Sequence, residues 1–187
     1  TEIYTLSLHD ALPIYIYWYL PFPATVKGEF DNWTFNSGLT HFYLYTPICG
    51  DMTTWDISNT NITTFNVCGY NYNQNVSGDM SAWVLPDTLT TFNLGYLGNV
   101  TSIPTDYSNT SLTNISIYQA PKLSGDVTTF LFPTGNSINI YTYYTSLSGN
   151  LENFSHVLTG STSVSLQRNC FTGNLSGITF NPNVSSI

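Results

Sequence analysis

The residues of this sequence best placed to do chemistry are a histidine, His41, and the tyrosines and asparagines that follow it. A Ser-His-Asp arrangement needs a carboxylate that orients the imidazole, and glycoside hydrolysis needs a pair of facing carboxylates. No acidic residue falls on the strand face that we expect to carry His41, and His156 lies far away in the repeat order. We therefore predict no catalytic residues, no cofactor and no enzyme activity. A β-helical polysaccharide-cleaving enzyme is the minor alternative.

Metal binding is the second chemistry to weigh. Glu29, Asp51 and Asp79 each follow a glycine in successive repeats. Stacked like charges repel, and Ca²⁺ between the coils would relieve this repulsion. Three later repeats carry an uncharged amide at the same position: Asn99, Asn150 and Asn174. A turn-capping role explains every copy, so we predict no metal site.

The three cysteines, Cys49, Cys68 and Cys170, lack the spacing of metal ligands. Cys49 and Cys68 lie one repeat apart, so a disulfide between them stays open. Buried free thiols are the default expectation.

The charge balance excludes several classes of partner. Only 7% of the 187 residues are charged, and 3 Lys and Arg face 11 Asp and Glu, which gives a net charge of −8. A nucleic-acid binder needs a basic patch, so we expect no nucleic-acid partner. No apolar run reaches the length of a membrane span, so we expect no membrane insertion.

Two patterns alternate along the chain and define a repeat. The first is apolar-x-x-apolar-x-apolar, with copies ending at Leu20, Leu44, Val67, Leu94, Ile117, Ile140 and Leu166. The second is Gly, then an acidic or amide residue, then an apolar residue, with copies starting at Gly28, Gly50, Gly78, Gly98, Gly125, Gly149 and Gly173. Alternation at the last two apolar positions indicates a short strand with one buried face. Thr, Asn, Tyr and Gly between the apolar positions disfavour helix.

This repeat resembles the leucine-rich repeat over Tyr15 to Ile187. Lys122 to Val127 and Ser146 to Leu151 resemble the L-S-G-x-I element of the plant-type subclass, which implies a second short strand outside the main sheet. Asn169 falls at the family's inward asparagine position, but other copies carry Pro, Tyr, Leu or Ala there. The resemblance implies a mainly β, right-handed solenoid of about seven coils of about 22–27 residues, with short parallel strands and little helix. A flatter β-solenoid is the alternative geometry.

The residues between the buried strand positions are expected to share one open face. That face carries no carboxylate, Lys or Arg. Tyr offers flat apolar area with a polar tip, and Asn offers adaptable hydrogen bonding. The predicted ligand-binding residues are Tyr17, Tyr19, His41, Tyr43, Tyr45, Asn66, Asn93, Tyr118, Asn139 and Tyr141. The alternative is that Tyr and Thr occur there simply because they favour strands.

The first residues stand apart from the repeats. Tyr4 to Ile14 resembles the translation of a common sequencing adapter, so we expect residues 1–14 to be non-native. Residues 15–187 then form one repeat domain, which we expect to be truncated at both ends. Val184 and Ile187 fit the start of an eighth strand.

Together these features predict a non-catalytic recognition or adhesion module that binds a neutral glycan or a protein partner on the open face. The alternative is a structural spacer of a phage tail fibre or cell-surface stalk. Asn-x-Ser/Thr sequons, such as those at Asn61 and Asn109, exceed what composition predicts. They favour an extracellular or cell-surface location; a virion surface is the other location we keep open.

Overall fold

The computed structural model describes residues 14–19, 33–45, 50–134, 137–154 and 161–174, together with 176, 178 and 182. For residues 14–19, 70–75 and 162 the description covers the backbone alone.

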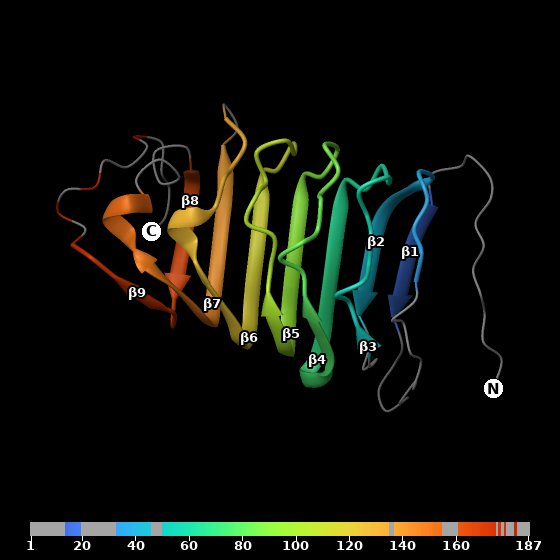
Figure 1. The fold of residues 1–187 in the computed structure, drawn as a ribbon, viewed down its shortest axis with the longest axis horizontal. Coiled ribbons are helices and arrows are strands. Elements are labelled where there is room, and N and C mark those ends of the chain that lie inside the picture. Colours follow the sequence, from blue (N-terminus) through green and yellow to red (C-terminus); the bar gives the residue numbers. More distant parts are fainter. Residues whose placement is uncertain are drawn as a thin grey trace.

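The described chain is mainly β and winds into a solenoid of about five turns. Its strands are β1 (Ile14–Tyr19), β2 (Leu39–Tyr45), β3 (Gly50–Asp51), β4 (Thr64–Asp79), β5 (Thr91–Ser102), β6 (Asn114–Asp126), β7 (Ile138–Asn150), β8 (Ser161–Gln167) and β9 (Cys170–Thr172). All pair in parallel in the order β1-β2-β4-β5-β6-β7-β8, with β3 on β4 and β9 on β7 (Figure 1). Two short 3₁₀ helices follow the long strands, η1 (Val127–Thr129) and η2 (Leu151–Phe154).

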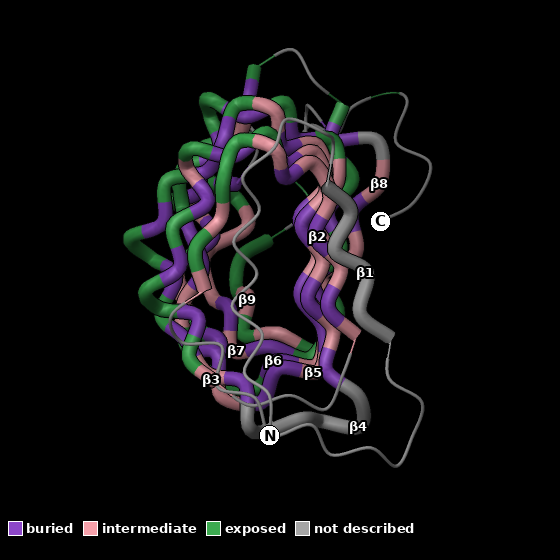
Figure 2. The backbone as a smooth tube through the Cα atoms, turned by 90° about the vertical axis from the view of Figure 1, so that its right-hand side faces the viewer, coloured by how far each residue is buried: buried purple, intermediate pink, exposed green. Residues whose placement is uncertain are grey.

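The first half of each long strand pairs in register with the same positions of its neighbours. A single column runs through the middle apolar position of β2 and of β4 to β8: Phe42, Phe65, Phe92, Ile115, Ile140 and Val164. These six side chains are at most 4% exposed. Figure 2, which looks along the stack, has the alternating strands on one side and the loops on the other. The core therefore lies between the sheet and an opposing wall of loops.

Stacked aromatic rings supply the opposing wall. Trp33, Trp55 and Trp83 stack on one another at 5.7 and 6.3 Å between ring centroids. Phe65 meets the edges of Trp55 and Trp83 at 6.4 and 5.6 Å. Burying each large apolar side chain contributes about 1.5–3 kcal/mol, and edge-to-face ring pairs add about 0.5–1.5 kcal/mol. Aromatic contacts thus join the two walls.

Three long strands, β5, β6 and β7, and the link between β8 and β9 each turn a corner at one residue in the left-handed region. Tyr96, Gln119, Tyr144 and Arg168 have φ values of 55°, 56°, 55° and 55°. This conformation costs a non-glycine residue about 1–2 kcal/mol. The residue after three of these corners is inward and buried, namely Leu97, Ala120 and Thr145. At these corners the strand directs one more side chain into the core, and the positive φ strains the backbone locally.

After the corner, strand segments pair again with their neighbours within the same sheet. Ser124 to Asp126 pairs with Ser146 to Ser148, and Ser148 to Asn150 pairs with β9. After the corner at Arg168, Asn169 Nδ2 donates to the Thr142 and Gln167 carbonyl oxygens, both at 3.1 Å.

The strand register corrects the sequence-based alignment of two repeats. In the first, Trp18 pairs with Leu44 at the last apolar position, which the repeat pattern assigns to Leu20. In the second, we expected Ile140 to fill the last apolar position of its repeat, but it pairs with Ile115 at the middle position. Thr142 fills the last position and is 4% exposed. Because threonine carries a hydroxyl group, a pattern of apolar residues does not identify this inward position.

Several expectations fall outside the described residues. These are the non-native origin of residues 1–13, the first glycine repeat at Gly28, and the eighth strand at Val184 and Ile187. Ile14 itself begins β1.

We expect Phe65→Ala to destabilise the fold by about 3–5 kcal/mol because it leaves a cavity between two stacked rings. Phe65 lies 5.2 Å from Phe42 and 5.6 Å from Phe92 between centroids. Urea unfolding would measure the change. Val84→Ala is the control, since Val84 is 69% exposed and should change stability by at most about 0.5 kcal/mol. Equal stability of the two variants would contradict the stacked core.

Candidate functional site

The open face is the side of β2, β4, β5, β6, β7 and β8 that points away from the core. Its residues fall into three rows across the strands. The upper row is His41, Thr64, Thr91, Asn114, Asn139 and Ser163. The middle row is Tyr43, Asn66, Asn93, Ser116, Tyr141 and Ser165. The lower row is Tyr45, Cys68, Gly95, Tyr118, Tyr143 and Gln167.

At the β2 end, aromatic rings line up along the strand. His41 stacks on Tyr43 at 6.3 Å, and Tyr43 stacks on Tyr45 at 6.3 Å with 14° between the ring planes. The imidazole nitrogens face hydroxyl groups, with Nδ1 3.0 Å from Thr40 Oγ1 and Nε2 3.4 Å from Thr63 Oγ1. These three predicted binding residues therefore lie together.

By backbone pairing, Tyr17 continues the middle row and Tyr19 continues the lower row. They pair with Tyr43 and Tyr45 in the β1–β2 register. Their side chains lie outside the described part of the chain.

The middle of the face is polar and uncharged. Asn66 Nδ2 donates a hydrogen bond to the Tyr45 hydroxyl at 2.6 Å. Asn93, the next residue of the middle row, has a buried Oδ1 without a hydrogen-bond partner among the described residues. The two predicted asparagines are thus neighbours, and one of them holds an unsatisfied acceptor.

Tyr118 reaches across a neighbouring strand. Gly95 lies between Tyr118 and Cys68 in the lower row, and a Cβ built on Gly95 would lie 2.7 Å from the Tyr118 hydroxyl oxygen. The absent side chain leaves room for the ring, and the hydroxyl oxygen lies 3.2 Å from Cys68 Sγ. The repeat pattern predicts Tyr118 on this face but not its contact with Cys68.

Burial decides the protonation of this pair. It raises the pKa of the Cys68 thiol, an effect that the Tyr118 hydrogen bond partly offsets. Burial also raises the pKa of Tyr118, and the hydrogen bond with Cys68 raises it further. Both groups are neutral at physiological pH, so Cys68 supplies no thiolate nucleophile. Cys68 and Cys170 are free thiols, but Cys68 is half-buried and Cys170 is exposed, so the expectation of buried thiols is wrong for these two. Cys49 lies outside the described residues.

A second tyrosine cluster lies at the β7 end. Tyr141 and Tyr143 stack at 6.4 Å with 23° between their planes, and Tyr118 meets Tyr141 at 6.2 Å. The Arg168 guanidinium carbon lies 5.4 Å from the Tyr143 ring centroid, a cation–π contact. Asn139 is exposed in the upper row. Sequence analysis missed Tyr143 because it took Ile140 for the last inward position.

The acidic and amide residues that follow the repeat glycines cap turns. Side-chain oxygens of Asp51, Asp79, Asp126, Asn150 and Asn174 accept from the backbone N–H two residues later at 2.8–3.0 Å. Asn99 instead accepts from Lys122 Nζ at 2.6 Å, and Glu29 lies outside the described residues.

The carboxylates do not pair with one another in the ladder as the stacking argument assumed. Asp51 pairs with Ser77, and Asp126 pairs with Ser148, two residues short of the next repeat's amide or carboxylate. Across the described ranges, no cluster of three or more His, Cys, Asp or Glu side chains is placed to hold a metal ion.

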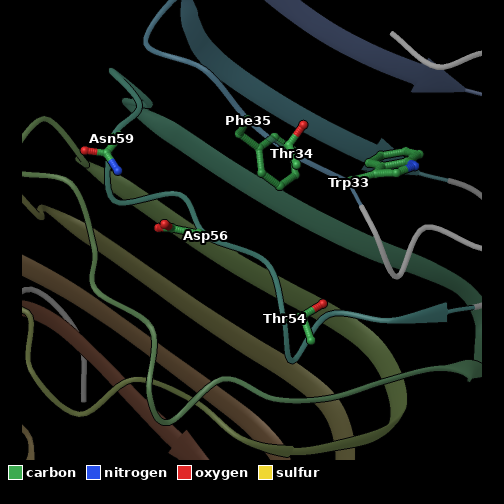
Figure 3. A pocket seen from close by; sticks show the side chains of 6 residues that line it. All are labelled: Trp33, Thr34, Phe35, Thr54, Asp56 and Asn59. Carbon is green, nitrogen blue, oxygen red and sulfur yellow. The ribbon is translucent and has the colours of Figure 1, made fainter. Parts of the chain in front are cut away.

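A pocket of about 170 Å³ lies on the opposing wall, away from the open face (Figure 3). Two neighbouring segments line it with Trp33, Thr34, Phe35, Thr54, Asp56 and Asn59. Asp56 Oδ1 already accepts from the Ser58 N–H at 2.9 Å. That bond is part of a turn, and nothing in the lining suggests a reaction.

Comparisons with protein-family models, curated proteins and solved structures found no match to this chain. In the part of the chain that the structure describes, no helix has both the length and the apolar character to cross a membrane.

We expect Asp79→Asn to make stability less sensitive to acid. Hydrogen bonds from Ser81 lower the pKa of Asp79 from 3.8, so its contribution to stability is present above about pH 4 and is lost as the pH falls further. Asparagine keeps the accepting oxygen and does not titrate. Thermal melts at about pH 6 and about pH 3 should show a smaller drop for the variant. An unchanged drop would mean that this cap does not contribute.

We expect Gly95→Ala to uncover the Cys68 thiol by pushing the Tyr118 ring aside. In a Cys49→Ser/Cys170→Ser background, Cys68 should then react severalfold faster with a thiol reagent. Tyr118→Phe is the matched control, because it keeps the covering ring and removes only the hydroxyl group. Equal rates for Gly95→Ala and its parent would refute this packing.

Proposed function

We propose that this protein is a non-catalytic recognition module that binds a neutral glycan or a protein partner on its open face. One observation carries the proposal: stacked tyrosines flank an uncharged strip of amide and hydroxyl groups in a single strand register. Tyr143 and the candidates Tyr43, Tyr45 and Tyr141 belong to these stacked pairs.

The chemistry of the face suits binding by contact rather than by charge. None of the described residues in its three rows is acidic, lysine or arginine. Tyrosine adds large contact area with few rotatable bonds, so it loses little conformational entropy on binding. Asn66 and Asn93 offer donors and acceptors beside that apolar area.

We also assign the solenoid to the leucine-rich-repeat class with about seven coils. The recurring apolar pattern, the second strand segments and the asparagine at Asn169 support this assignment. For location we propose the extracellular or cell surface, or a virion surface. The exposed sequon asparagines Asn61 and Asn109 are compatible with it.

The second candidate function is a structural spacer, and the regularity of the stack favours it. Successive turns repeat the same register over β2, β4 and β5, which is the only property that a spacer needs. The two functions differ in one observable. A binding module gains thermal stability when its ligand is added, by about 2.7 kcal/mol at a hundredfold excess over Kd, whereas a spacer gains none.

We expect the double variant Tyr43→Ala/Tyr45→Ala to lose about ten- to hundredfold in affinity, because it removes one stacked pair. Titration against whatever ligand a glycan and protein screen identifies would measure it. The circular dichroism spectrum should stay unchanged, since neither ring is part of the core.

The control for this variant is Leu131→Ala. Leu131 is 54% exposed and lies on the opposing wall. Equal affinity of the double variant and the parent would show that ligand binds elsewhere.

A further inference from the structure

The two tyrosine pairs occupy matching positions at opposite ends of the open face. Tyr43 and Tyr141 belong to the middle row, and Tyr45 and Tyr143 to the lower row. Within each pair the rings stack, at 6.3 and 6.4 Å between centroids. Each pair therefore presents the same kind of aromatic surface.

The distance between the pairs follows from the strand order. β4, β5 and β6 lie between β2 and β7, so the pairs are separated by four strand spacings. At the ordinary spacing of hydrogen-bonded strands, this is about 19 Å. A single ring-sized ligand cannot contact both pairs, but an extended one that crosses the strands can.

The middle row between the pairs carries shorter, polar side chains. They are Asn66, Asn93 and Ser116. Asn93 Oδ1 is buried and unpartnered among the described residues, a state that ordinarily carries a free-energy cost. Tyr118 lies beside the strip in the lower row and adds aromatic surface.

We propose that the open face binds a linear, neutral oligosaccharide that lies across the strands and stacks on Tyr43/Tyr45 at one end and on Tyr141/Tyr143 at the other. This inference rests on the proposed function and names its ligand class.

The lack of charge on the face favours a neutral ligand. Arg168 is the basic residue beside the second pair, and its guanidinium group lies over the Tyr143 ring. The other two basic residues are Lys27 and Lys122, and Lys122 Nζ donates to Asn99 beyond the corner. Among the described residues, an acidic glycan would therefore find no cation along the three rows and one, Arg168, beside the second pair.

The form of the face favours a glycan over a peptide. Sheet hydrogen bonds occupy the backbone of the central strands, so a peptide cannot add to them as a further strand. A sugar ring offers one flat C–H surface for a tyrosine and hydroxyl groups around its rim for asparagine and serine. A chain of such rings repeats both features along its length, as the two pairs and the strip between them require.

The test is calorimetric titration with neutral cello-, malto-, laminari- and xylo-oligosaccharides, from disaccharide to octasaccharide. For the series that binds, affinity should rise at least tenfold with chain length and then level off once the chain spans both pairs. Tyr43→Ala and Tyr141→Ala should each weaken octasaccharide binding about five- to tenfold. The double variant Tyr43→Ala/Tyr141→Ala should bind the octasaccharide no more tightly than it binds a disaccharide. Leu131→Ala should match the parent.

The possible failures are distinguishable. Equal affinity for disaccharide and octasaccharide, or an effect of Tyr43→Ala with none of Tyr141→Ala, overturns the two-pair site and leaves the proposed function standing. If no neutral oligosaccharide binds, but a protein partner is lost in Tyr43→Ala/Tyr45→Ala, the glycan inference is wrong and the recognition face remains. If neither class of ligand depends on these tyrosines, both proposals fail.

Discussion

Every buried column of this protein depends on the register in which one strand pairs with the next. Side chains alternate between the two faces of a strand, so a slip of one residue would move Phe65 from the core to the open face. The Phe42–Phe65–Phe92 stack and the edges of Trp55 and Trp83 make such a slip costly. The same register aligns the two tyrosine pairs, so one constraint builds the core and the candidate site together.

The low charge of the chain follows from this architecture. Polar groups that stack at strand spacing are best uncharged, since like charges at that distance repel. Threonines accordingly form ladders, as when the Thr63 and Thr90 hydroxyls donate to the carbonyl oxygens of Thr40 and Thr63 at 3.1 and 2.8 Å. Carboxylates occur at turns, where they accept backbone hydrogen bonds and keep a lowered pKa, as at Asp79. The open face thereby stays free of charge.

The repeat pattern predicted the parallel solenoid, the turn caps and most of the open face, because each depends on residue types that recur at a fixed period. The pattern failed where a polar residue fills a buried position that is apolar in the other repeats. Thr142 fills such a position, and because the pattern placed Ile140 there, it left Tyr143 off the predicted face. It also assumed that equivalent carboxylates stack, whereas Asp51 pairs with Ser77. The Tyr118–Cys68 contact depends on an empty position at Gly95, and a one-dimensional pattern carries no such information.

Two surfaces are candidate binding sites, the open face and the small pocket beside Trp33 and Phe35. The stacked tyrosine pairs favour the open face. Hydrogen–deuterium exchange with and without a saturating neutral oligosaccharide distinguishes them most directly. The account predicts slower exchange in β2 and β7 at the same ligand concentration, with the segments around Thr54 and Asn59 unchanged. Protection confined to those two segments, with β2 and β7 unaffected, would contradict it.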